Sequence, residues 1–514
     1  MIAPLVIAAA LAASAVASER PKYIAFAWEF AGNSPQSLLE LADKFDRTPL
    51  DGVGIKLKAR AKVNGVMTNL RHKSFMHGPA WPKSAFKKQI PYFRKLTKHK
   101  SMRHSFVLSF ACPKTRISWT DDAQWALVAN NMRTVAWVAR EGGFRGVAAD
   151  PEDYCKIRQF DRRADDPPYN ELCAIVRRRG REVFKPVFEE FPDATVHFFW
   201  FMSMVEYYSR YDRSDVVRNT RVDEHLWPAF LNGVLDVLPP GASINDGDET
   251  AYDYSAVKNG YRNGAYMFHC IYPKLVAPEN IEKYRRQVRY APPIYMDMYI
   301  NREGTRWYKA PTENSSTETL RRDLIQATDV SGGYVWFWSE KHPWVNRGPK
   351  WQKPDGRILD ATWEETLPGV TRMMEWVKNP VELYDREVAA LAKKGALVNL
   401  AKDISVTVTN GYKTVAFTGV KGGEYYGISF SVKGDSARVN VFFKDKDDKR
   451  VKPTCNMVYA DVGRGIVRVP EESVRGVVVF SAGNGDDEKT VFDDIRIYKL
   501  FEVQNNLQIK KRQP

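Results

Sequence analysis

Acidic residues recur in this sequence where short apolar segments end. The sharpest case is Asp150-Pro151-Glu152, which directly follows the apolar run GVAA. Cleavage of a glycosidic bond needs a carboxylic acid that protonates the leaving oxygen. It also needs a second group that acts as nucleophile or base, or that orients a nucleophilic amide of the substrate. Two neighbouring carboxyl groups raise the pKa of one of them. We therefore predict that Glu152 is a general acid and that Asp150 helps to hold its proton.

The spacing of Asp150 and Glu152 supports this interpretation. In an extended strand, residues i and i+2 point to the same side, so both carboxyl groups can face one opening. Acids that follow a strand can instead cap the next helix. Here the next expected helix begins near Tyr169, well downstream, which disfavours the capping alternative.

A second catalytic carboxylate has three candidates. Glu249 ranks first because it follows an apolar segment in a turn rich in Gly and Asp, beside Tyr252. Its alternative role is in an N-cap cluster for a helix near Ser255. Glu340 and Asp297 follow in rank, and Glu340 could also be a surface acid paired with its neighbour Lys341.

Aromatic side chains accompany these acids, and the chain contains 14 Trp, 24 Tyr and 26 Phe. Flat rings form platforms against which pyranose faces pack, although protein cores also use them. The expected substrate-binding residues share a position at or just after the end of an apolar segment: Trp28, Glu29, Trp200, Asp246, Tyr252, Asp297, Trp336, Trp338 and Glu340.

The elements that must position these residues are short apolar segments alternating with amphipathic helical segments. Eight of the apolar segments qualify as strands, at residues 23–30, 52–57, 105–110, 146–150, 195–201, 242–246, 293–298 and 333–338. The second is followed by a long loop and then by a basic helix near residues 84–99. Eight strands, each followed by helix, predict an α/β fold of the (β/α)8 TIM barrel type, whose chemistry lies at the C-terminal ends of the strands. An open doubly wound sheet would need fewer strands or a glycine-rich phosphate turn.

The pattern of predicted secondary structure changes after Gly395, from alternating strands and helices to strands alone. Short β-rich runs separated by turns such as Asn410-Gly411 predict a C-terminal antiparallel β-sandwich. We expect three segments: a signal peptide at 1–17, a catalytic barrel at 20–395 and a jelly-roll-like accessory sandwich at 396–505. The sandwich segment contains no Trp, so its Tyr residues would have to supply any ring that stacks on sugar.

From about Tyr23 to Trp376 the chain resembles barrel-type glycoside hydrolases of secreted bacterial type. Asp150-x-Glu152 is similar to the end of the D-x-x-D-x-D-x-E motif of chitinase-like retaining enzymes. That resemblance implies that Glu152 is the general acid and that Asp150 positions a substrate acetamido group. Arg145 and Ala148 stand at the two earlier acidic positions. The other large clan has Asn-Glu at strand four and Glu at strand seven, where this chain has Pro-Glu and Asp297, so the exact family stays open. The C-terminal segment resembles the jelly-roll modules, similar to carbohydrate-binding modules, that are appended to secreted glycosidases.

The N-terminus predicts export. Residues 2–16 are apolar, and Ala15-Val16-Ala17 is a small-x-small cleavage pattern. We expect cleavage after Ala17 and a secreted, periplasmic or cell-surface location, with an uncleaved anchor as the alternative. Beyond this segment no apolar run reaches about 18 residues, so no transmembrane segment is expected after cleavage.

The charge balance points to an anionic partner. Lys plus Arg number 77 and Asp plus Glu 62, a formal net charge of +15. Basic residues cluster at 83–104, 162–181 and 510–512. In an exported protein an anionic glycan is a more natural partner than nucleic acid, for which no binding module is present. Ordinary solvated helix faces are the alternative.

The sequence predicts neither a cofactor nor a metal site. It contains no CxxC, no HExxH and no glycine-rich phosphate loop. The predicted activity is hydrolysis of glycosidic bonds in a poly- or oligosaccharide. The alternatives are a non-catalytic glycan-binding barrel and an esterase, although no GxSxG occurs.

Overall fold

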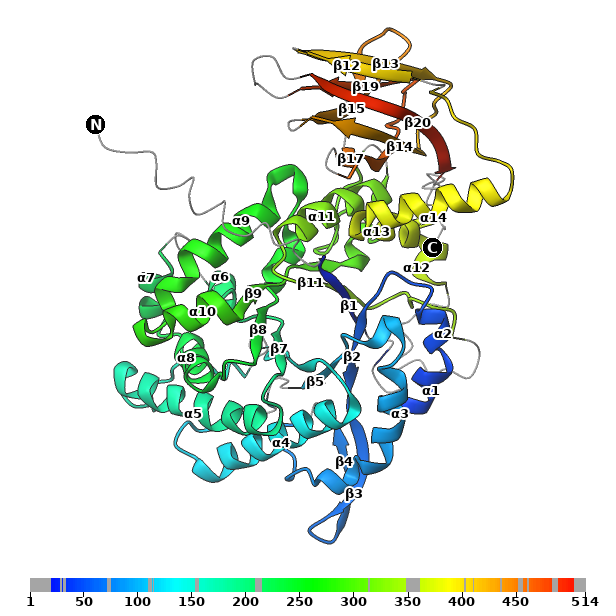
Figure 1. The fold of residues 1–514 in the computed structure, drawn as a ribbon. Helices are drawn as coiled ribbons and strands as arrows, with labels where there is room; N and C mark the ends of the chain where they lie inside the picture. Colours follow the sequence, from blue (N-terminus) through cyan, green and yellow to red (C-terminus); the bar gives the residue numbers. More distant parts are fainter. Residues whose placement is uncertain are drawn as a thin grey trace, which may run out of the picture. The chain divides into compact units, whose positions relative to one another are not determined.

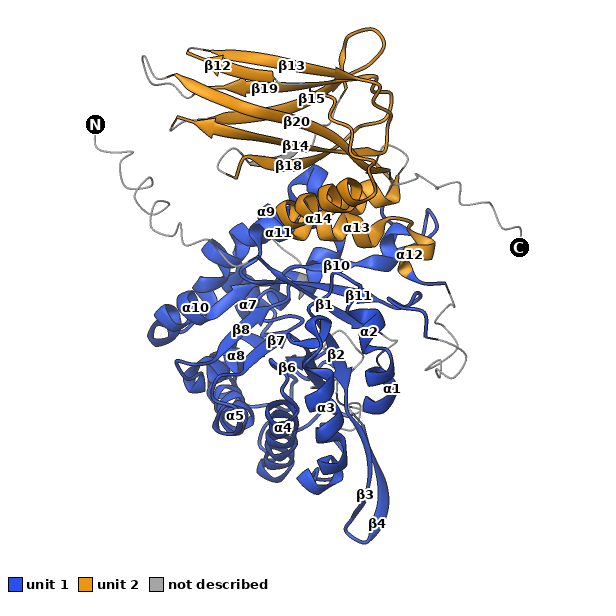
Figure 2. Ribbon diagram, turned by 45° about the vertical axis from the view of Figure 1, so that its right-hand side comes forward, with its two compact units in different colours: residues 1–309, 322–362 blue, residues 310–321, 363–514 orange. Residues whose placement is uncertain are grey.

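The computed structural model describes most of the chain in two compact units (Figure 2). The described residues are 20–27, 30, 34–71, 75–109, 113, 115–152, 157–208, 215–312, 315–347, 361–401, 404–409, 411–434, 437–451, 456–459, 462–482 and 489–502. Unit 1 contains residues 1–309 and 322–362, and unit 2 contains residues 310–321 and 363–514. The predicted signal peptide, Trp28 and Glu29 lie outside the described residues.

Unit 1 is built on a parallel sheet with the strand order β10-β11-β1-β2-β5-β6-β7-β8-β9 (Figure 1). Its strands are β1 (Lys22–Ala27), β2 (Gly52–Lys56), β5 (Phe106–Ser109), β6 (Gly146–Ala149), β7 (Thr195–Phe198), β8 (Ser243–Asp246), β9 (Val288–Tyr290), β10 (Pro293–Tyr295) and β11 (Tyr334–Ser339). Short, almost wholly buried strands of this kind are typical of a parallel sheet covered on both faces.

The sheet closes because β9 and β10 are two halves of one strand. Between them, the Ala291 N–H donates to the Asp246 carbonyl at 2.9 Å, and the Pro292 carbonyl accepts from the Trp336 N–H at 3.2 Å. The segment therefore joins β8 on one side to β11 on the other. Proline has no N–H to donate, which explains the break in the ladder. The predicted (β/α)8 barrel is confirmed, with its seventh strand beginning at Val288 instead of Pro293.

Aromatic rings fill the barrel. The ring of Phe26 stacks on His197 at 5.2 Å and packs edge-on against Trp336 at 5.7 Å. Burial in this apolar surrounding lowers the pKa of His197 to about 3, so the imidazole is neutral. Gly54 gives Phe26 its space, since a Cβ at that position would lie 2.0 Å from the ring.

Helices alternate with the strands of unit 1. They are α1 (Pro35–Glu40), α2 (Ala42–Phe45), α3 (Ile90–Leu96), α4 (Asp122–Gly142), α5 (Tyr169–Glu190), α6 (Met204–Tyr208), α7 (Val216–Val222), α8 (Trp227–Val237), α9 (Gly260–Tyr266), α10 (Ile281–Gln287) and α11 (Ser316–Val330), whose first six residues are counted in unit 2. Local chemistry sets the ends of α4. The Asp121 side chain accepts from the Gln124 N–H, and Gly143 closes the helix at a φ of 77°. Among the described residues, no helix combines the length and the apolar character that a membrane crossing requires.

A β-ribbon replaces part of the long loop expected after the second strand. β3 (Lys58–Val63) and β4 (Val66–Arg71) pair antiparallel around Asn64 and Gly65, whose φ angles are 49° and 83°. These angles fit the Asn-Gly hairpin turn. That dipeptide between alternating residues is the sequence signal that could have predicted the ribbon.

Unit 2 contains the predicted antiparallel β-sandwich, which is confirmed. One sheet has the order β12-β20-β14-β18-β17 and the other β13-β19-β15-β16. The strands are β12 (Ile404–Val408), β13 (Tyr412–Thr418), β14 (Glu424–Lys433), β15 (Arg438–Lys444), β16 (Arg450–Val451), β17 (Asn456–Tyr459), β18 (Arg464–Arg468), β19 (Arg475–Ser481) and β20 (Thr490–Glu502). Tyr425 and Tyr426 are buried, whereas Tyr412 is exposed.

The same unit holds the helices α12 (Trp363–Thr366), α13 (Val370–Lys378) and α14 (Pro380–Lys393). Trp376 of α13 packs edge-on against Tyr425 of the sandwich, with ring centroids 5.2 Å apart. Glu318 lies within 3.6 Å of the Arg468 guanidinium in β18, and both side chains are buried. The segment 310–321 is thereby attached to the sandwich. The predicted segment boundary at Gly395 stays a prediction.

Candidate active site

The predicted catalytic acids lie at the ends of two barrel strands. Asp150 directly follows β6 and Glu249 follows β8, and β7 is the single strand between them. Neighbouring strands are about 4.8 Å apart, so the two strand ends lie about 10 Å apart. The Glu249 N–H donates to the Phe199 carbonyl at 3.1 Å, just beyond β7, which ties the Glu249 backbone to the middle strand.

The carboxyl groups of Asp150, Glu152 and Glu249 interact electrostatically. Burial raises the pKa of Glu249 well above its usual range, and the charges of Asp150 and Glu152 raise it further. Burial also raises the pKa of Asp150, together with the charge of Glu152, while the ammonium of Lys56 opposes the rise. The structure therefore brings together the three acids that the sequence analysis selected, and it adds Lys56, which that analysis missed.

Backbone conformation, and not strand alternation, places Glu152. β6 already ends at Ala149, and Glu152 has a left-handed φ of 42°. The argument from an extended strand therefore does not hold at this residue. The Glu152 N–H donates to the Asp150 carboxylate instead. Left-handed conformations of residues other than glycine are costly and cluster at functional sites.

Asp248, next to Glu249, has the same left-handed φ of 42° and is fully buried. Its carboxyl accepts from the Tyr290 hydroxyl at 2.8 Å. Burial raises the pKa of Asp248 well above its usual range, and the charges of Glu206 and Asp246 add to the effect. Asp248 is a buried acid whose raised pKa favours its neutral form, and it lies in the turn that carries Glu249.

One oxygen of Glu249 lacks a hydrogen-bond partner. This atom, Oε2, is buried and accepts no hydrogen bond from the described residues. A buried polar atom without a partner is costly unless a ligand or ordered water satisfies it. Glu249 as a whole is partly exposed.

Asp246 holds a loop. Its carboxylate accepts from the backbone N–H groups of Phe201 and Ser203 and from the Ser203 hydroxyl, at 3.1, 3.1 and 2.5 Å. A further N–H, that of Asp248, donates at 3.3 Å. These contacts fix the segment that follows β7, where Trp200 is also buried. A substrate contact by Asp246 or Trp200 stays a prediction.

Asp297 and Glu340 meet at the ends of β10 and β11. The Asp297 carboxylate accepts from the N–H groups of Glu340 and Lys341 at 2.7 and 3.1 Å. Burial raises the pKa of Asp297 to about 6, although these two hydrogen bonds oppose the rise. Glu340 in turn accepts from the Trp338 indole N–H at 3.2 Å. The buried Asp297 thus holds the backbone of the turn at Glu340 and Lys341, and Glu340 is the more exposed acid of the two.

An aromatic wall stands beside the acids. Tyr252 packs on Tyr295 with ring centroids 4.9 Å apart, and Trp307 lies perpendicular to Tyr252 at 6.2 Å. Trp307 and Trp338 are partly exposed, whereas Trp336 is fully buried and donates to the Gly247 carbonyl at 2.9 Å. Trp307 was not among the predicted site residues. Its place in the loop after the seventh strand was the available signal.

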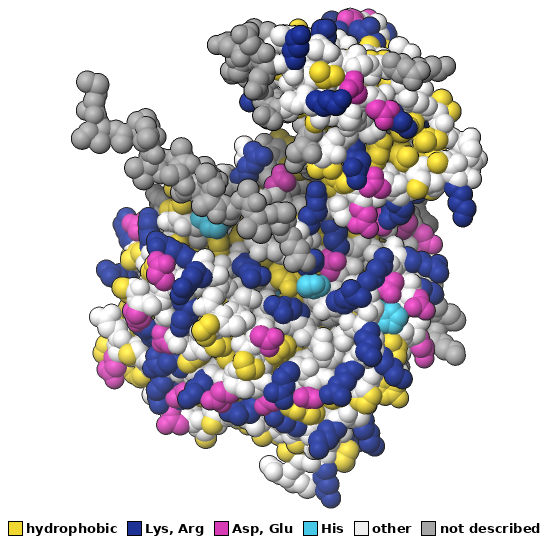
Figure 3. Space-filling model, in the orientation of Figure 1, with side chains coloured by type: hydrophobic (Ala, Val, Ile, Leu, Met, Phe, Trp, Pro, Cys, Tyr) yellow, Lys and Arg dark blue, Asp and Glu magenta, His cyan; other side chains and the backbone are white. Residues whose placement is uncertain are grey.

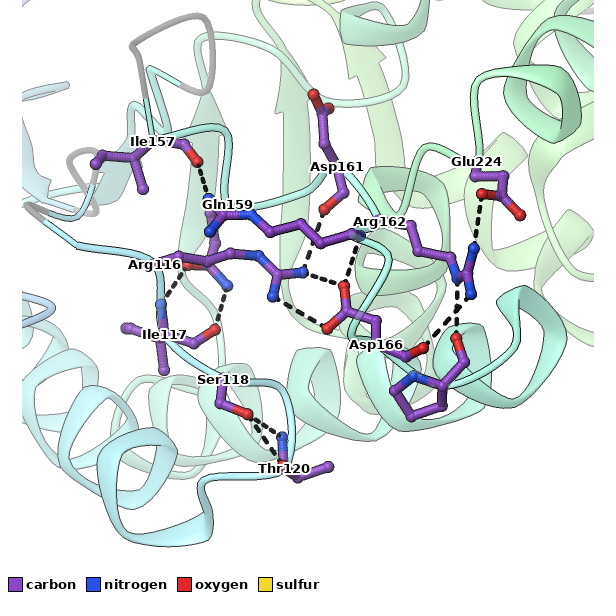
Figure 4. A network of polar contacts seen from close by, with 12 residues as sticks. Arg116, Ile117, Ser118, Thr120, Ile157, Gln159, Asp161, Arg162, Asp166 and Glu224 are labelled. Carbon is purple, nitrogen blue, oxygen red and sulfur yellow. Dashed lines mark hydrogen bonds and ion pairs between the residues drawn. The ribbon is translucent and has the colours of Figure 1, made fainter.

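A clamp joins the loops that follow β5 and β6 (Figure 4). The backbone N–H and carbonyl of Ile117 pair with the two amide atoms of Gln159, both at 2.8 Å. The Arg116 guanidinium binds both carboxylate oxygens of Asp166, at 3.0 and 2.5 Å, and the carbonyl of Asp161 at 3.2 Å. These contacts join residues 159–166, which follow β6, to the loop that follows β5.

The basic cluster at 162–181 is largely neutralised within the protein. Arg162 pairs with Glu224, and Arg177 and Arg181 both pair with Asp236. Arg178 and Arg179 likewise pair with carboxylates on α4 and α5. On the face of the molecule that Figure 3 draws, Lys and Arg side chains are interspersed with Asp and Glu. An anionic partner for this cluster stays a prediction.

One group of side chains in the described part of the chain has metal-ligand geometry. Ligand atoms of Asp43, Asp46 and His99 lie within 4.8 Å of one another. Asp46 already accepts from the N–H and hydroxyl of Ser101 and lies 2.9 Å from the His99 ring. These residues precede β2 and β5, at the end of the barrel opposite the acids, so the candidate active site does not involve them.

No protein-family model and no curated protein matches the chain. Solved structures with similar folds include a GH18 chitinase from Pseudoalteromonas aurantia, with 11% identity, a TM-score of 0.32 and coverage of 62% of this chain and 94% of that chain. A glycoside hydrolase family 5 enzyme from Prevotella bryantii is 9% identical, with a TM-score of 0.37 and coverage of 71% and 98%. A D-allulose 3-epimerase from Methylomonas sp. is 11% identical, with a TM-score of 0.36 and coverage of 70% and 98%. At these values the likeness carries no argument about activity, so the proposal below depends on the site itself.

Proposed function

We propose that this protein hydrolyses glycosidic bonds of an oligo- or polysaccharide, with Glu249 and Glu152 as its catalytic pair. The observation that carries the proposal is the cluster of Asp150, Glu152 and Glu249 at two strand ends, in which burial and the two neighbouring carboxyl groups raise the pKa of Glu249. Carboxyl groups that lie close together disfavour one another's ionisation, which favours retention of a proton in the cluster. A retained proton beside a carboxylate is what cleavage by acid and base or nucleophile requires.

The roles within the pair differ from those expected from the sequence. Glu249 is the proposed general acid, because burial and the two neighbouring acids raise its pKa and its Oε2 atom has no hydrogen-bond partner among the described residues. Glu152 is the proposed nucleophile or base on the other side of β7. Asp150 shares the protons of the cluster, and Lys56 limits how strongly Asp150 holds one. Trp307 and Trp338 supply rings on which a sugar face can stack.

The test compares Glu249→Gln and Glu152→Gln on two substrates, a natural glycan and an aryl glycoside whose phenolate leaves without protonation. Glu249→Gln should lower turnover of the natural glycan by about 10²–10⁴-fold and that of the aryl glycoside much less. Glu152→Gln should lower both. Glu40→Gln, on the exposed surface of α1, is the matched control and should change neither.

The outcomes separate the assignments. If Glu152→Gln spares the aryl glycoside and Glu249→Gln does not, the two roles are reversed and the activity stands. If the wild type binds glycans but turns over no glycoside in a panel, the barrel is a non-catalytic binding protein and the proposal fails.

We propose that the protein acts outside the cytoplasm. The support is the apolar N-terminal segment with its Ala15-Val16-Ala17 pattern. N-terminal sequencing of the exported protein should begin at Ser18. An intact Met1 on protein recovered from the cytoplasm would contradict export.

A further inference from the structure

The β3–β4 ribbon presents one wholly exposed face. In the antiparallel register Lys58 stands opposite Arg71, Arg60 opposite Asn69 and Lys62 opposite Met67. Residues directly opposite each other share a face, so these six side chains lie on the same side, and each is exposed. The opposite face is mostly half-buried, and Leu70 on it is fully buried.

The exposed face is strongly cationic. Four of its six residues are Lys or Arg, and residues 58–71 contain no acid. Among the described residues Lys58, Arg60 and Lys62 form no ion pair. Lys58, Arg60 and Lys62 repeat about every 7 Å along one strand, and like charges this close repel one another. An anionic partner on this face would relieve that repulsion.

The ribbon grows out of the rim that carries the candidate acids. β2 ends at Lys56, whose charge lowers the pKa of Asp150, and β3 begins two residues later at Lys58. Figures 1 and 2 show the ribbon projecting beyond the helices of the barrel. Its six-residue strands span about 20 Å. A polymer lying along the ribbon would therefore have one end near the site.

We propose that this face of the ribbon binds an anionic polysaccharide, through uronate or sulfate groups spaced along its chain. The choice of a glycan as the polymer rests on the proposed function. Asn69 adds an amide that can hydrogen-bond to sugar hydroxyl groups. The face contains no aromatic ring, whereas proteins that bind single-stranded nucleic acid use rings on which bases stack.

The test uses the full-length chain with Lys58, Arg60 and Lys62 all replaced by Gln. The control replaces Lys413, Lys446 and Lys449, three exposed lysines of the sandwich, and so changes the net charge equally. Binding of labelled polygalacturonate, dextran sulfate, neutral dextran and single-stranded DNA is measured at about 0.01 M and about 0.15 M salt, where the Debye length falls from about 30 Å to about 8 Å.

The ribbon variant should bind polygalacturonate or dextran sulfate about tenfold more weakly than wild type at low salt, as expected for three exposed ion pairs. The control variant should bind both polyanions as tightly as the wild type. Binding of neutral dextran should be the same for all three proteins. The polyanion that shows the larger loss identifies uronate or sulfate as the preferred group. Equal losses in both variants, or none in either, would overturn the proposal, as would DNA bound more tightly than both glycans.

Failure here is distinguishable from failure of the proposed hydrolysis. The ribbon variant should turn over a small neutral aryl glycoside at the wild-type rate, because no residue of the ribbon belongs to the catalytic pair. Loss of polymer binding with that turnover intact supports the ribbon proposal. Absence of turnover in every variant, with binding still dependent on the ribbon, would refute only the hydrolysis.

Discussion

The Arg116–Asp166 ion pair offers a quantitative test of how the loop beyond Glu152 is held. Both side chains are only 9% exposed, and two of the guanidinium nitrogens bind the two carboxylate oxygens. Removing one partner of a buried pair costs about 3–5 kcal/mol. Asp166 also accepts from the Arg163 N–H at 2.8 Å, which would remain. We therefore expect Arg116→Met to lower the free energy of unfolding of the barrel by about 3 kcal/mol, the low end of that range.

The assay is a double-mutant cycle with Arg116→Met, Asp166→Asn and the double variant, followed by denaturant unfolding. Each single variant leaves one polar partner buried, so the double variant should be hardly less stable than either single one. The expected coupling energy is about 2–3 kcal/mol. Additive losses below about 1 kcal/mol each would refute the reasoning, since such values are typical of exposed pairs.

The pH dependence of the same pair has a definite sign. Burial acts to raise the pKa of Asp166, but the hydrogen bonds from Arg116 and from the Arg163 backbone outweigh it, and the net pKa is lowered. The stabilisation is therefore complete above about pH 4, the pKa of an unfolded Asp, and is lost as the pH falls through the lowered value. Arg116→Met should weaken this acid dependence. If wild type and Arg116→Met lost stability equally as the pH fell below 4, Arg116 would not be what lowers the pKa of Asp166.

Three further predictions concern other buried acids. Burial raises the pKa of Asp297 to about 6, so its contribution to the free energy of unfolding is complete below about pH 4 and is lost as the pH rises through 6. The wild type should therefore lose up to about 3 kcal/mol of stability over this range. Asp297→Asn should abolish that loss in unfolding measurements made at several pH values. Asp248→Asn should retain activity, because Asn tolerates a φ of 42° and resembles the neutral carboxyl that the raised pKa favours. Asp248→Val should lose activity, and equal activity of the two variants would contradict a positioning role. Glu318→Gln should destabilise unit 2 by about 3 kcal/mol, since it removes the carboxylate that binds the buried Arg321 and lies 3.6 Å from Arg468; an unchanged unfolding transition of the sandwich would contradict this.

Local patterns were sufficient to predict the architecture. A strand buried on both faces must be apolar throughout, and a helix that covers it must be amphipathic, so β6, β7 and β8 were recognisable at their correct positions. The same logic predicted the sandwich, whose strands alternate between a buried and an exposed face. Because catalytic groups of a barrel follow its strands, the segments that carry Asp150 and Glu249 were predictable as well.

Only the tertiary structure decided the surroundings of these residues. Glu152 has a left-handed φ that the strand pattern did not indicate. The pKa of Glu249 is raised by burial and by Asp150 and Glu152, which are about 100 residues away in the sequence. The pKa of Asp150 likewise responds to Lys56, a distant residue of the sequence. The attachment of Glu318 to Arg468 likewise joins segments about 150 residues apart. Sequence periodicity reports which face of an element is buried, because burial repeats along the element. It does not report which charges meet across the fold, because electrostatic energy depends on distance in space and on the local dielectric.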